Sequence, residues 1–410
     1  MNVYDLLTER GFIAQSTHPN EARELLGRES VAFYIGFDPT SDSLTAGGFI
    51  QIMTLMHMQR AGHVPIVLMG AGTVMVGDPS GRSDIRKMMT RDTIEYNKSK
   101  IQAQIGKFID FNAGRAIVVD NSDWLLTLNY IDFIREYGVH FSVNRMLAAE
   151  CYKSRLEEGL TFFEMNYMIM QSYDFLELYR KYNCKLQMGG NDQWSNIISG
   201  VELTRRVDQG EVFGITSHLL LDSTGGKMGK SLKGAIYLDA DKTSPYEFFQ
   251  YWRNIEDASV EKCLRLLTFM PLDEVAKLAS LPGSEINKAK ERLAYELTML
   301  VHGKDEADKA LQAAKALFSG EAEGGSIPTS EMASADFEKG MHIIDLLERT
   351  GLIPTRSEGR RLIQQGGIRI NGILIEATDH IVGLADFSDN QLMIKKGKKV
   401  FHRVSTVPKL

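Results

Sequence analysis

The sequence predicts an α/β fold built on a parallel sheet that helices cover on both faces. Continuous apolar runs, rich in β-branched and aromatic residues and short enough for buried strands, lie at Val31–Phe37 and Val64–Met69. A stretch with helical spacing of its apolar residues, Phe49–Arg60, separates the two runs. Continuous apolar strands that alternate with helices are typical of parallel sheets buried on both faces.

The same patterns predict the other elements of this first part. Two further strands are expected at Ala116–Val119 and Cys184–Met188. Helices are expected in the residues up to Gly27 and at Asp92–Phe108, Trp124–Tyr137, Ser142–Leu156, Thr161–Tyr182 and 191–206.

After residue 235 the pattern becomes helical. Helices are expected at Tyr246–Trp252, Val260–Leu267, Leu272–Ala279, Glu285–Val301 and Ala307–Phe318. Residues 320–336, rich in Gly, Ser, Glu and Ala, predict a flexible linker. Two more helices, Ile343–Leu347 and Glu358–Gln365, and a hairpin turn at Asn371-Gly372 predict a small α+β domain at residues 337–410.

Composition and charge restrict the class of protein. A chain of 410 residues suggests two or three domains. Its three cysteines have no metal-ligand spacing, which favours a reducing compartment. The first residues do not resemble a signal peptide, and the longest uncharged stretch, Val64–Gly77, is too short to span a bilayer. We therefore expect a cytoplasmic protein. Residues 341–410 hold 11 Lys and Arg against 7 Asp and Glu, a net charge of +4, whereas the whole chain carries −6. A basic tail on an acidic body suggests a polyanionic partner.

The first candidate site is the turn between the strand Val31–Phe37 and the helix Phe49–Arg60. A polar cluster beginning at Asp38-Pro39-Thr40 follows the strand, and Gly47 and Gly48 stand where the helix begins. Free backbone N–H groups and the positive end of the helix dipole favour a phosphate there. An ordinary strand-to-helix turn explains the same pattern, and on this stretch alone it is the favoured interpretation.

The helix Thr161–Tyr182 carries the second candidate site. Thr161 and Glu164 form a capping box, and Tyr167, Gln171 and Asp174 share one face of a largely apolar helix. Buried polar groups need partners, because an unpaired one costs about 1–3 kcal/mol. The stripe is therefore either a hydrogen-bond network inside the core or a set of groups aimed at a small ligand.

Two glycine-rich loops complete the candidates. Gly189-Gly190-Asn191-Asp192-Gln193-Trp194 lies between a strand and a helix, where ribose and phosphate contacts are common, although a capped turn is the simpler explanation. Lys227-Met228-Gly229-Lys230-Ser231 places two lysines among glycines. Such a loop suits a polyphosphate, although in isolation the pattern favours a solvated basic turn.

Taken together and in this order, these motifs resemble those of bacterial-type tyrosyl-tRNA synthetases, a class I aminoacyl-tRNA synthetase family. The resemblance covers nearly the whole chain. It rests on Tyr34-Ile35-Gly36-Phe37-Asp38-Pro39-Thr40, Val76-Gly77-Asp78-Pro79-Ser80-Gly81, Tyr167…Gln171…Asp174, Gln187-Met188-Gly189-Gly190-Asn191-Asp192-Gln193-Trp194 and Lys227-Met228-Gly229-Lys230-Ser231.

The resemblance implies a fold and an activity. It implies a Rossmann-like catalytic domain with a connective insertion at 1–235 and an α-helical anticodon-binding domain at 236–319. The small domain at 337–410 would bind RNA. The resemblance further implies a homodimer that activates L-tyrosine with ATP and charges tRNA(Tyr). Magnesium would accompany ATP and pyrophosphate, without a metal site on the protein.

The resemblance also implies residue roles. Tyrosine would be bound by Tyr34, Thr73, Asp78, Tyr167, Gln171 and Asp174. The nucleotide and adenylate would contact Gly36, Asp38, Gly47, Gly190, Asp192, Gln193 and Lys230. Catalysis would use Thr40, Lys227, Lys230 and Ser231, and Arg82 and Arg86 would meet pyrophosphate. RNA phosphates would be met by Arg356, Arg360, Arg361, Arg369, Lys395 and Lys396.

One stretch departs from the family. Its His-Ile-Gly-His signature falls at Thr45-Ala46-Gly47-Gly48, which retains the glycine and lacks both histidines. The alternative function is therefore a slow or non-catalytic synthetase paralogue that acts as an RNA-binding protein. Activation of a different amino acid is disfavoured by the pair Tyr34 and Asp174.

Overall fold

The computed structural model describes residues 2–80, 89–231, 234–319, 328–388, 390–397 and 400–407. The chain forms two compact units. The first comprises Met1–Ser244 and Tyr251–Leu297, and the second comprises Pro245–Gln250 and Thr298–Leu410.

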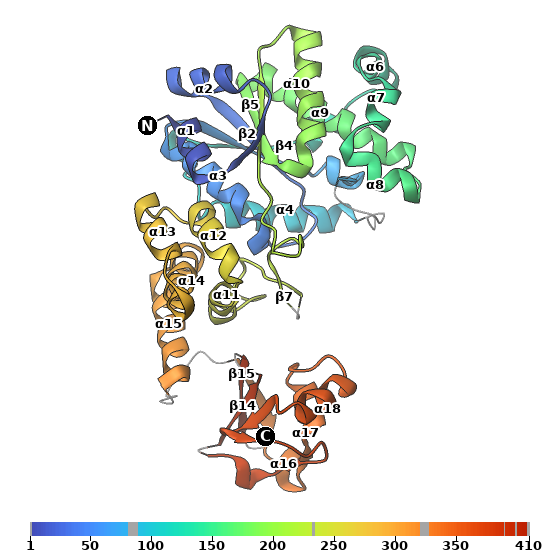
Figure 1. Cartoon of the computed structure of the whole chain (residues 1–410). Helices are drawn as coiled ribbons and strands as arrows, with labels where there is room; N and C mark the ends of the chain where they lie inside the picture. The colour runs from blue at the N-terminus through green and yellow to red at the C-terminus, as the bar shows by residue number, and fades with distance from the viewer. Residues whose placement is uncertain are drawn as a thin grey trace. The chain divides into compact units, whose positions relative to one another are not determined.

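A six-stranded sheet forms the centre of the first unit (Figure 1). Its strand order is β1-β6-β5-β2-β3-β4, with neighbouring strands parallel except that β1 runs antiparallel to β6 at the edge. The bounds are β1 (Ile13–Ser16), β2 (Ala32–Phe37), β3 (Val64–Met69), β4 (Ile117–Asp120), β5 (Cys184–Gly190) and β6 (Phe213–Ser217). The four predicted strands are present, and β1 and β6 are additional.

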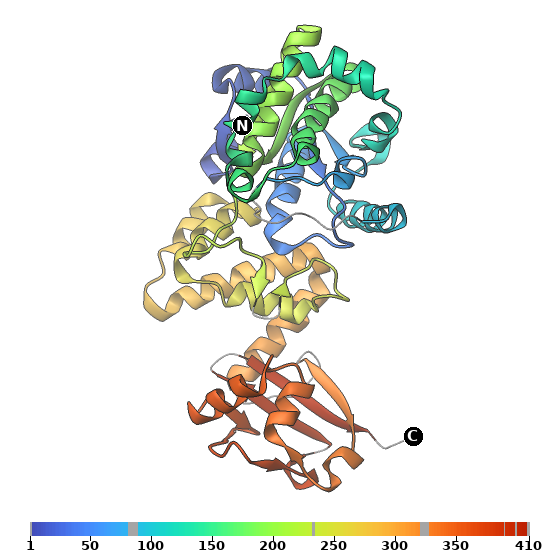
Figure 2. The same ribbon diagram turned by 90° about the vertical axis from the view of Figure 1, so that its right-hand side faces the viewer.

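Helices cover both faces of this sheet, as the sequence predicted (Figures 1 and 2). Consecutive residues of β3 are buried, which requires cover on both sides. Tyr34 and Leu68 pack with Phe175 and Val201 of two helices that follow, α9 (Phe162–Tyr182) and α10 (Trp194–Asp208). Phe33, Ile35 and Val67 alternate with these residues along the strands, so they point to the opposite face, and they are buried as well. The other helices of this part are α1 (Val3–Arg10), α2 (Pro19–Arg28), α3 (Phe49–Arg60) and α4 (Arg91–Ile105).

Three expected helices are interrupted. The N-terminal helical stretch is broken by β1, because Gly11 takes a left-handed conformation (φ 85°) that ends α1. The predicted helices Trp124–Tyr137 and Ser142–Leu156 divide into shorter ones. Asn129 starts a new helix by accepting hydrogen bonds from two backbone N–H groups. The resulting pieces are α5 (Ser122–Leu125), α6 (Tyr130–Glu136), α7 (Val143–Leu147) and α8 (Glu150–Glu158).

The predicted helical region after the sheet is confirmed. Its elements are α11 (Pro245–Arg253), α12 (Val260–Leu267), α13 (Leu272–Ala279), α14 (Ile286–His302) and α15 (Lys304–Ser319). Within the first unit, Arg10 ties α1 to the end of α12. Its buried guanidinium donates to the carbonyl oxygens of Arg265 and Thr268, at 2.7 and 3.0 Å.

The C-terminal part of the second unit is a small α+β fold. Its five-stranded sheet has the order β12-β11-β14-β15-β9. The strands are β9 (Thr329–Ala333), β11 (Ile368–Ile370), β12 (Ile373–Leu374), β14 (Gln391–Lys396) and β15 (Val400–Val407), with a separate pair β10 (Met341–His342) and β13 (Ile381–Val382). The helices are α16 (Ala335–Glu338), α17 (Ile343–Arg349) and α18 (Arg356–Gln364).

Two predictions for this region have different outcomes. The hairpin turn is confirmed, since Asn371 and Gly372 both have positive φ, 47° and 84°, between β11 and β12. The linker assignment is wrong for the residues from Thr329 onward, because β9 pairs in parallel with β15 and belongs to the domain's sheet. Residues 320–327 lie outside the described part of the chain.

Candidate active site

The carboxyl ends of four parallel strands surround a cavity of about 400 Å³ in the first unit. Asp38 follows β2, Thr73 follows β3, Asn121 follows β4 and Asp192 follows β5. All four residues line the cavity. Ligands of open parallel sheets bind at this edge, because the loops after neighbouring strands meet there.

Asp174 stands at the buried end of the cavity. The indole N–H of Trp124 donates to its Oδ1 at 2.8 Å, and the Asn121 amide donates to its Oδ2 at 3.0 Å. Burial raises the pKa of this carboxyl group to about 7, although both hydrogen bonds act to lower it. The carboxylate is therefore fixed in place while part of its hydrogen-bonding capacity remains for a ligand.

Tyr34 lies on β2 beside this carboxylate. Its side chain is 1% exposed, and its hydroxyl has no hydrogen-bond partner among the described residues. Burial, with the charge of Asp174 as a smaller cause, raises the pKa of Tyr34 well above its ordinary value. The phenol thus stays protonated and remains a donor. An unpaired buried hydroxyl is costly, which indicates that a polar group of the ligand forms the missing hydrogen bond.

Gln187 and Gln171 present two more unpaired groups to the cavity. Gln187 is the β5 neighbour of Tyr34 in the sheet and is 2% exposed. The side-chain oxygens of both glutamines are buried and lack partners within the described residues. These oxygens accept hydrogen bonds, which suits a ligand that carries N–H or O–H groups.

A second polar cluster connects the strands to α9. Asp38 accepts hydrogen bonds from the Thr73 hydroxyl (2.9 Å) and the Tyr167 hydroxyl (3.0 Å). Asp78 accepts one from the Gln193 amide at 2.6 Å. These contacts place two carboxylates in the cavity wall, where they favour a cationic group on the ligand.

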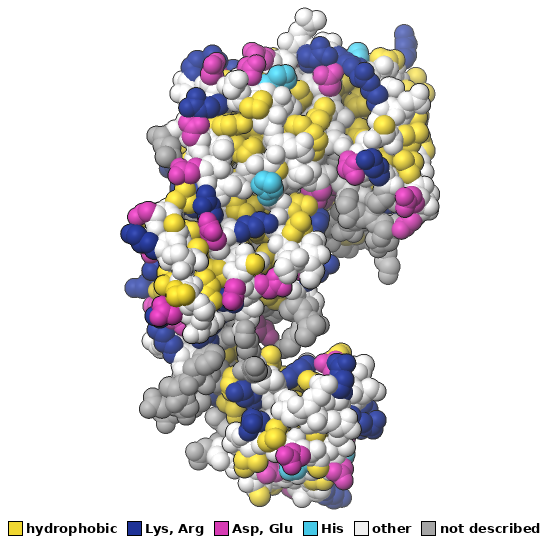
Figure 3. Space-filling view, viewed as in Figure 1, with side chains coloured by type: hydrophobic (Ala, Val, Ile, Leu, Met, Phe, Trp, Pro, Cys, Tyr) yellow, Lys and Arg dark blue, Asp and Glu magenta, His cyan; other side chains and the backbone are white. Residues whose placement is uncertain are grey.

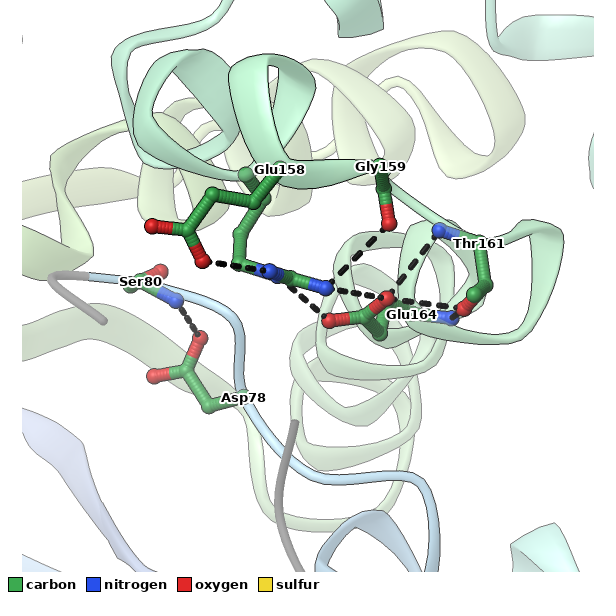
Figure 4. Close-up of polar contacts among 7 residues, drawn as sticks. Asp78, Ser80, Glu158, Gly159, Thr161 and Glu164 are labelled. Atoms are coloured by element: carbon green, nitrogen blue, oxygen red, sulfur yellow. Dashed lines mark hydrogen bonds and ion pairs between the residues drawn. The ribbon is translucent and has the colours of Figure 1, made fainter. Parts of the chain in front are cut away.

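The amino end of α9 is anchored by a buried ion pair (Figure 4). Arg155 donates through Nε to Glu164 at 2.8 Å, and its guanidinium also reaches the Gly159 carbonyl oxygen. Glu164 completes the predicted capping box with Thr161. In the same view, the backbone N–H of Ser80 donates to Asp78. These contacts hold the first turns of α9, and hence Tyr167, in register with the cavity.

The lysine loop closes the other end of the cavity. Lys227 forms an ion pair with Asp192 at 3.0 Å, and the Gly229 N–H donates to the Tyr251 hydroxyl. A Cβ atom at Gly47 would lie 2.3 Å from the Met228 carbonyl oxygen. Gly47 is therefore required for the close approach of this loop.

The expectation of free N–H groups at the start of α3 is wrong for Gly48 and Phe49. A short 3-10 turn, η1 (Ala46–Gly48), precedes α3. Gly48 N–H donates to the Thr45 carbonyl oxygen at 3.0 Å, and Phe49 N–H donates to that of Ala46. Both donors are thus used within the turn and are not free to bind a phosphate.

Most of the predicted site residues meet in this cavity. Its wall contains Tyr34, Gly36, Asp38, Gly47, Thr73, Asp78, Tyr167, Gln171, Asp174, Gly190, Asp192, Gln193, Lys227 and Lys230. Thr40 is exposed and is not part of the wall. Arg82, Arg86 and the Ser231 side chain lie outside the described part of the structure.

Sequence reasoning missed three residues of the site, Asn121, Trp124 and Gln187. Asn121 and Trp124 are far from α9 in sequence, so no local spacing connects them to Asp174. A signal existed for Asn121, because it lies two residues after the predicted strand Ala116–Val119, at the same end of the sheet as Asp38.

The basic residues of the C-terminal domain fall into two groups. Arg360, Arg361 and Arg369 are exposed, and Arg369 is the cross-strand neighbour of Lys395. By contrast, Lys396 donates to the Leu352 carbonyl oxygen and pairs with Glu358. Arg356 forms ion pairs with Asp345 and Glu348 on α17. Among the described residues, two of the predicted RNA contacts, Arg356 and Lys396, are therefore already engaged in ion pairs within the domain.

No helix in the described part of the chain is both long and apolar enough to cross a membrane.

Family models match most of the chain. One described as "tRNA synthetases class I (W and Y)" matches residues 27–319, and one described as "Tyrosine--tRNA ligase SYY-like C-terminal domain" matches residues 324–404. A tyrosine--tRNA ligase of Acetivibrio thermocellus is 58% identical over 99% of this chain and 100% of its own length. One from Lachnoclostridium phytofermentans is 58% identical over 98% of each chain.

Solved structures agree with these relatives. A C-terminally truncated mitochondrial tyrosyl-tRNA synthetase of Aspergillus nidulans is 27% identical, with a TM-score of 0.69 over 77% of this chain and 94% of that one. The fold alone is shared with a tyrosyl-tRNA synthetase from Archaeoglobus fulgidus at 19% identity, with a TM-score of 0.58 over 75% of this chain and 99% of that one. The relatives support the catalytic interpretation over the non-catalytic alternative. The chain belongs to the class I tRNA synthetases and, within them, to the tyrosine--tRNA ligases of bacterial type.

Proposed function

We propose that this chain activates L-tyrosine with ATP and transfers the tyrosyl group to the 3′ end of tRNA(Tyr). The observation that carries the proposal is the unpaired Tyr34 hydroxyl beside Asp174 at the closed end of the cavity. A substrate phenol there would donate to the Asp174 carboxylate and accept from Tyr34. Since protein synthesis consumes the product, we place the protein in the cytoplasm.

The other polar groups fit the remainder of the substrates. The ammonium group of tyrosine would lie among Thr73, Asp78, Tyr167 and Gln171, which supply carboxylate, hydroxyl and amide oxygens. The adenylate would extend past the glycine-rich loop toward the lysines. Its contacts would be Gly36, Asp38, Gly47, Gly190, Asp192 and Gln193, all of which line the cavity.

The chemistry needs orientation and charge stabilisation more than proton transfer. A carboxylate oxygen of tyrosine attacks the α-phosphorus of ATP, and a new P–O bond forms. The bond from that phosphorus to the bridging oxygen breaks, and pyrophosphate leaves with the electron pair. Lys227 and Lys230 would stabilise the charge that develops on the phosphate oxygens. The terminal ribose hydroxyl of the tRNA then takes the tyrosyl group and releases AMP.

Magnesium would come with the nucleotide. Among the residues that the structure describes, no group of three His, Cys, Asp or Glu side chains is placed to hold a metal ion. Mg²⁺ prefers to keep several waters and to bind substrate phosphates, where it neutralises negative charge. Among the described residues of the cavity wall, the cations that the chain itself contributes are Lys227 and Lys230.

Tyrosine-dependent exchange of pyrophosphate into ATP tests the proposal. Purified protein should catalyse the exchange with L-tyrosine and much less with L-phenylalanine, which lacks the phenolic hydroxyl. An absence of exchange with tyrosine would contradict the proposed activity.

We also propose a homodimer, supported by exposed apolar side chains on the segment between β4 and β5, residues 121–183. Yellow side chains gather over the region of α6–α8 in Figure 3. The exposed apolar residues of this segment are Leu126, Tyr130, Ile131, Ile134, Val139, Val143, Leu156, Phe162 and Phe163. Contiguous exposed apolar surface favours a protein partner, and a second copy is the simplest one. Sedimentation should give twice the chain mass, and Phe163→Asp should shift it toward the monomer.

A further inference from the structure

The backbone of the lysine loop is held from both sides at its centre. Gly229 lies between Lys227 and Lys230 in the sequence. Its N–H donates to the Tyr251 hydroxyl at 2.6 Å, and its carbonyl oxygen accepts a hydrogen bond from the Ile236 N–H at 2.8 Å. Because both backbone groups of this residue are bonded, its orientation is fixed, and the directions in which the chain leaves toward the two lysines are fixed with it.

Close packing restricts the same position further. Gly229 is buried, with a φ of 92° that side-chain-bearing residues rarely adopt. A Cβ atom on Gly229 would collide with the backbone nitrogen of Gly47. The preceding Met228 is buried as well, and its N–H donates to the Leu220 carbonyl oxygen at 2.8 Å. The centre of the loop is therefore a packed backbone segment, while the two lysine side chains are exposed.

Tyr251 belongs to α11, and the residues that follow it hold the ends of the loop segment. Glu256 accepts a hydrogen bond from the Ser223 N–H at 3.1 Å. Lys262 donates to the Leu219 carbonyl oxygen at 3.2 Å. These two contacts lie before the first lysine, whereas the Tyr251 contact lies between the two lysines. The Tyr251 hydroxyl is therefore placed to control the position of both ammonium groups.

A fixed loop has an advantage for charge stabilisation. The glycines at 225 and 226 give the segment before Lys227 high conformational freedom. Ordering such a segment costs free energy, and a contact formed before the substrates arrive removes this cost from the reaction itself. Lys227 and Lys230 both line the cavity, so a preformed loop presents their charges without reorganisation.

We propose that Tyr251 is a positioning residue, whose hydroxyl holds Lys227 and Lys230 in place for adenylation by accepting the Gly229 N–H. Tyr251 is not part of the described cavity wall, so it acts through the loop and not on the substrate. This role rests on the proposed function, since it gives Tyr251 a part in the charge stabilisation assigned to the lysines.

Tyr251→Phe tests the role by removing the hydroxyl alone. Phenylalanine keeps the ring, which packs edge-on against Trp252 with 5.1 Å between the ring centroids. Single-turnover adenylate formation should slow about two- to tenfold, the effect of one hydrogen bond between neutral groups. The KM for tyrosine and the melting temperature should stay near those of the parent. Tyr96→Phe, which removes an exposed hydroxyl on α4 outside the cavity wall, is the matched control and should leave the rate unchanged.

A double-mutant cycle separates positioning from a general structural role. Tyr251→Phe is introduced into a variant that already combines Lys227→Ala with Lys230→Ala. If Tyr251 acts through the lysines, the substitution should cause no further slowing in this background. Equal slowing in both backgrounds would overturn the proposal, and so would a parental rate in Tyr251→Phe alone.

Hydrogen exchange tests the contact without any reaction. The Gly229 amide should exchange about two- to tenfold faster in Tyr251→Phe than in the parent, whereas the amides of α9 should keep their protection. Unchanged exchange at Gly229 would show that the hydroxyl does not hold the loop and would overturn the proposal. A parent that forms no adenylate would instead contradict the proposed function itself.

Discussion

At the scale of single residues, we expect Tyr34 to determine which amino acid fits. Tyr34→Phe removes a buried hydroxyl that has no partner within the described part of the protein. We expect the ratio of kcat/KM for tyrosine to kcat/KM for phenylalanine to fall. In the parent, phenylalanine leaves the Tyr34 hydroxyl unpaired, and the variant no longer has this hydroxyl to disfavour phenylalanine. Stability should be unchanged or slightly higher, since an unpaired buried group is lost. Pyrophosphate exchange with both amino acids measures the ratio, and an unchanged ratio would refute the assignment.

The raised pKa of Asp174 predicts the direction in which the stability of the fold changes with pH. Its pKa is raised to about 7 in the folded state, from 3.8 when unfolded. A raised pKa means that the folded state binds the proton more tightly. The contribution to stability is therefore complete below about pH 4 and is lost as the pH rises through 7.

The measurable result is a difference between the parent and Asp174→Asn. The free energy of unfolding of the parent, relative to this variant, should decrease by about 2–3 kcal/mol between pH 5 and pH 8. Denaturant titrations of both proteins at several pH values test this. A pH-independent difference would show that burial does not disfavour the charged carboxylate.

At the scale of elements, the lysine loop should act on the rate more than on tyrosine binding. Lys227→Ala and Lys230→Ala should slow single-turnover adenylate formation strongly, with tyrosine affinity little changed, because the charge that they stabilise develops in the transition state. Lys185→Ala is the matched control, since Lys185 pairs with Glu29 away from the cavity. Unchanged rates in both loop variants would reduce the loop to a surface turn.

The elements also show what the sequence could and could not predict. β2, β3 and α9 were recognisable because their apolar pattern is local and continuous. β1 was hidden, because four residues of mixed polarity become a strand only by pairing with β6, some 200 positions later. The Asp174 site could be predicted only in part, because some of its contacts join residues far apart in the sequence. Tyr34 and Asp174 carry family motifs, whereas Asn121 and Trp124 are brought to the carboxylate only by tertiary packing.

At the scale of the whole molecule, the chain should separate into an activating part and an RNA-binding part. A chain that ends at residue 320 should still form tyrosyl-adenylate, since the cavity lies in the first unit. It should bind tRNA more weakly and with a smaller salt dependence, because phosphate contacts are lost. Filter binding across a salt series tests this, and equal affinity and slope with and without the tail would contradict it. A cut between β9 and β15 would be unsuitable, because it would leave β9 without its partner strand.

The parallel pairing of β9 with β15 has a consequence for biosynthesis. β15 lies between β14 and β9, so the strand made last fills the gap between two strands made earlier. Domains generally fold in order as the polypeptide emerges from the ribosome. The tyrosine-binding unit can thus be complete while β9 and β14 still wait with open edges. Such edges recruit other strands. A ribosome that stalls before Val400 would hold a folded synthetase unit beside an unfinished, aggregation-prone C-terminal domain.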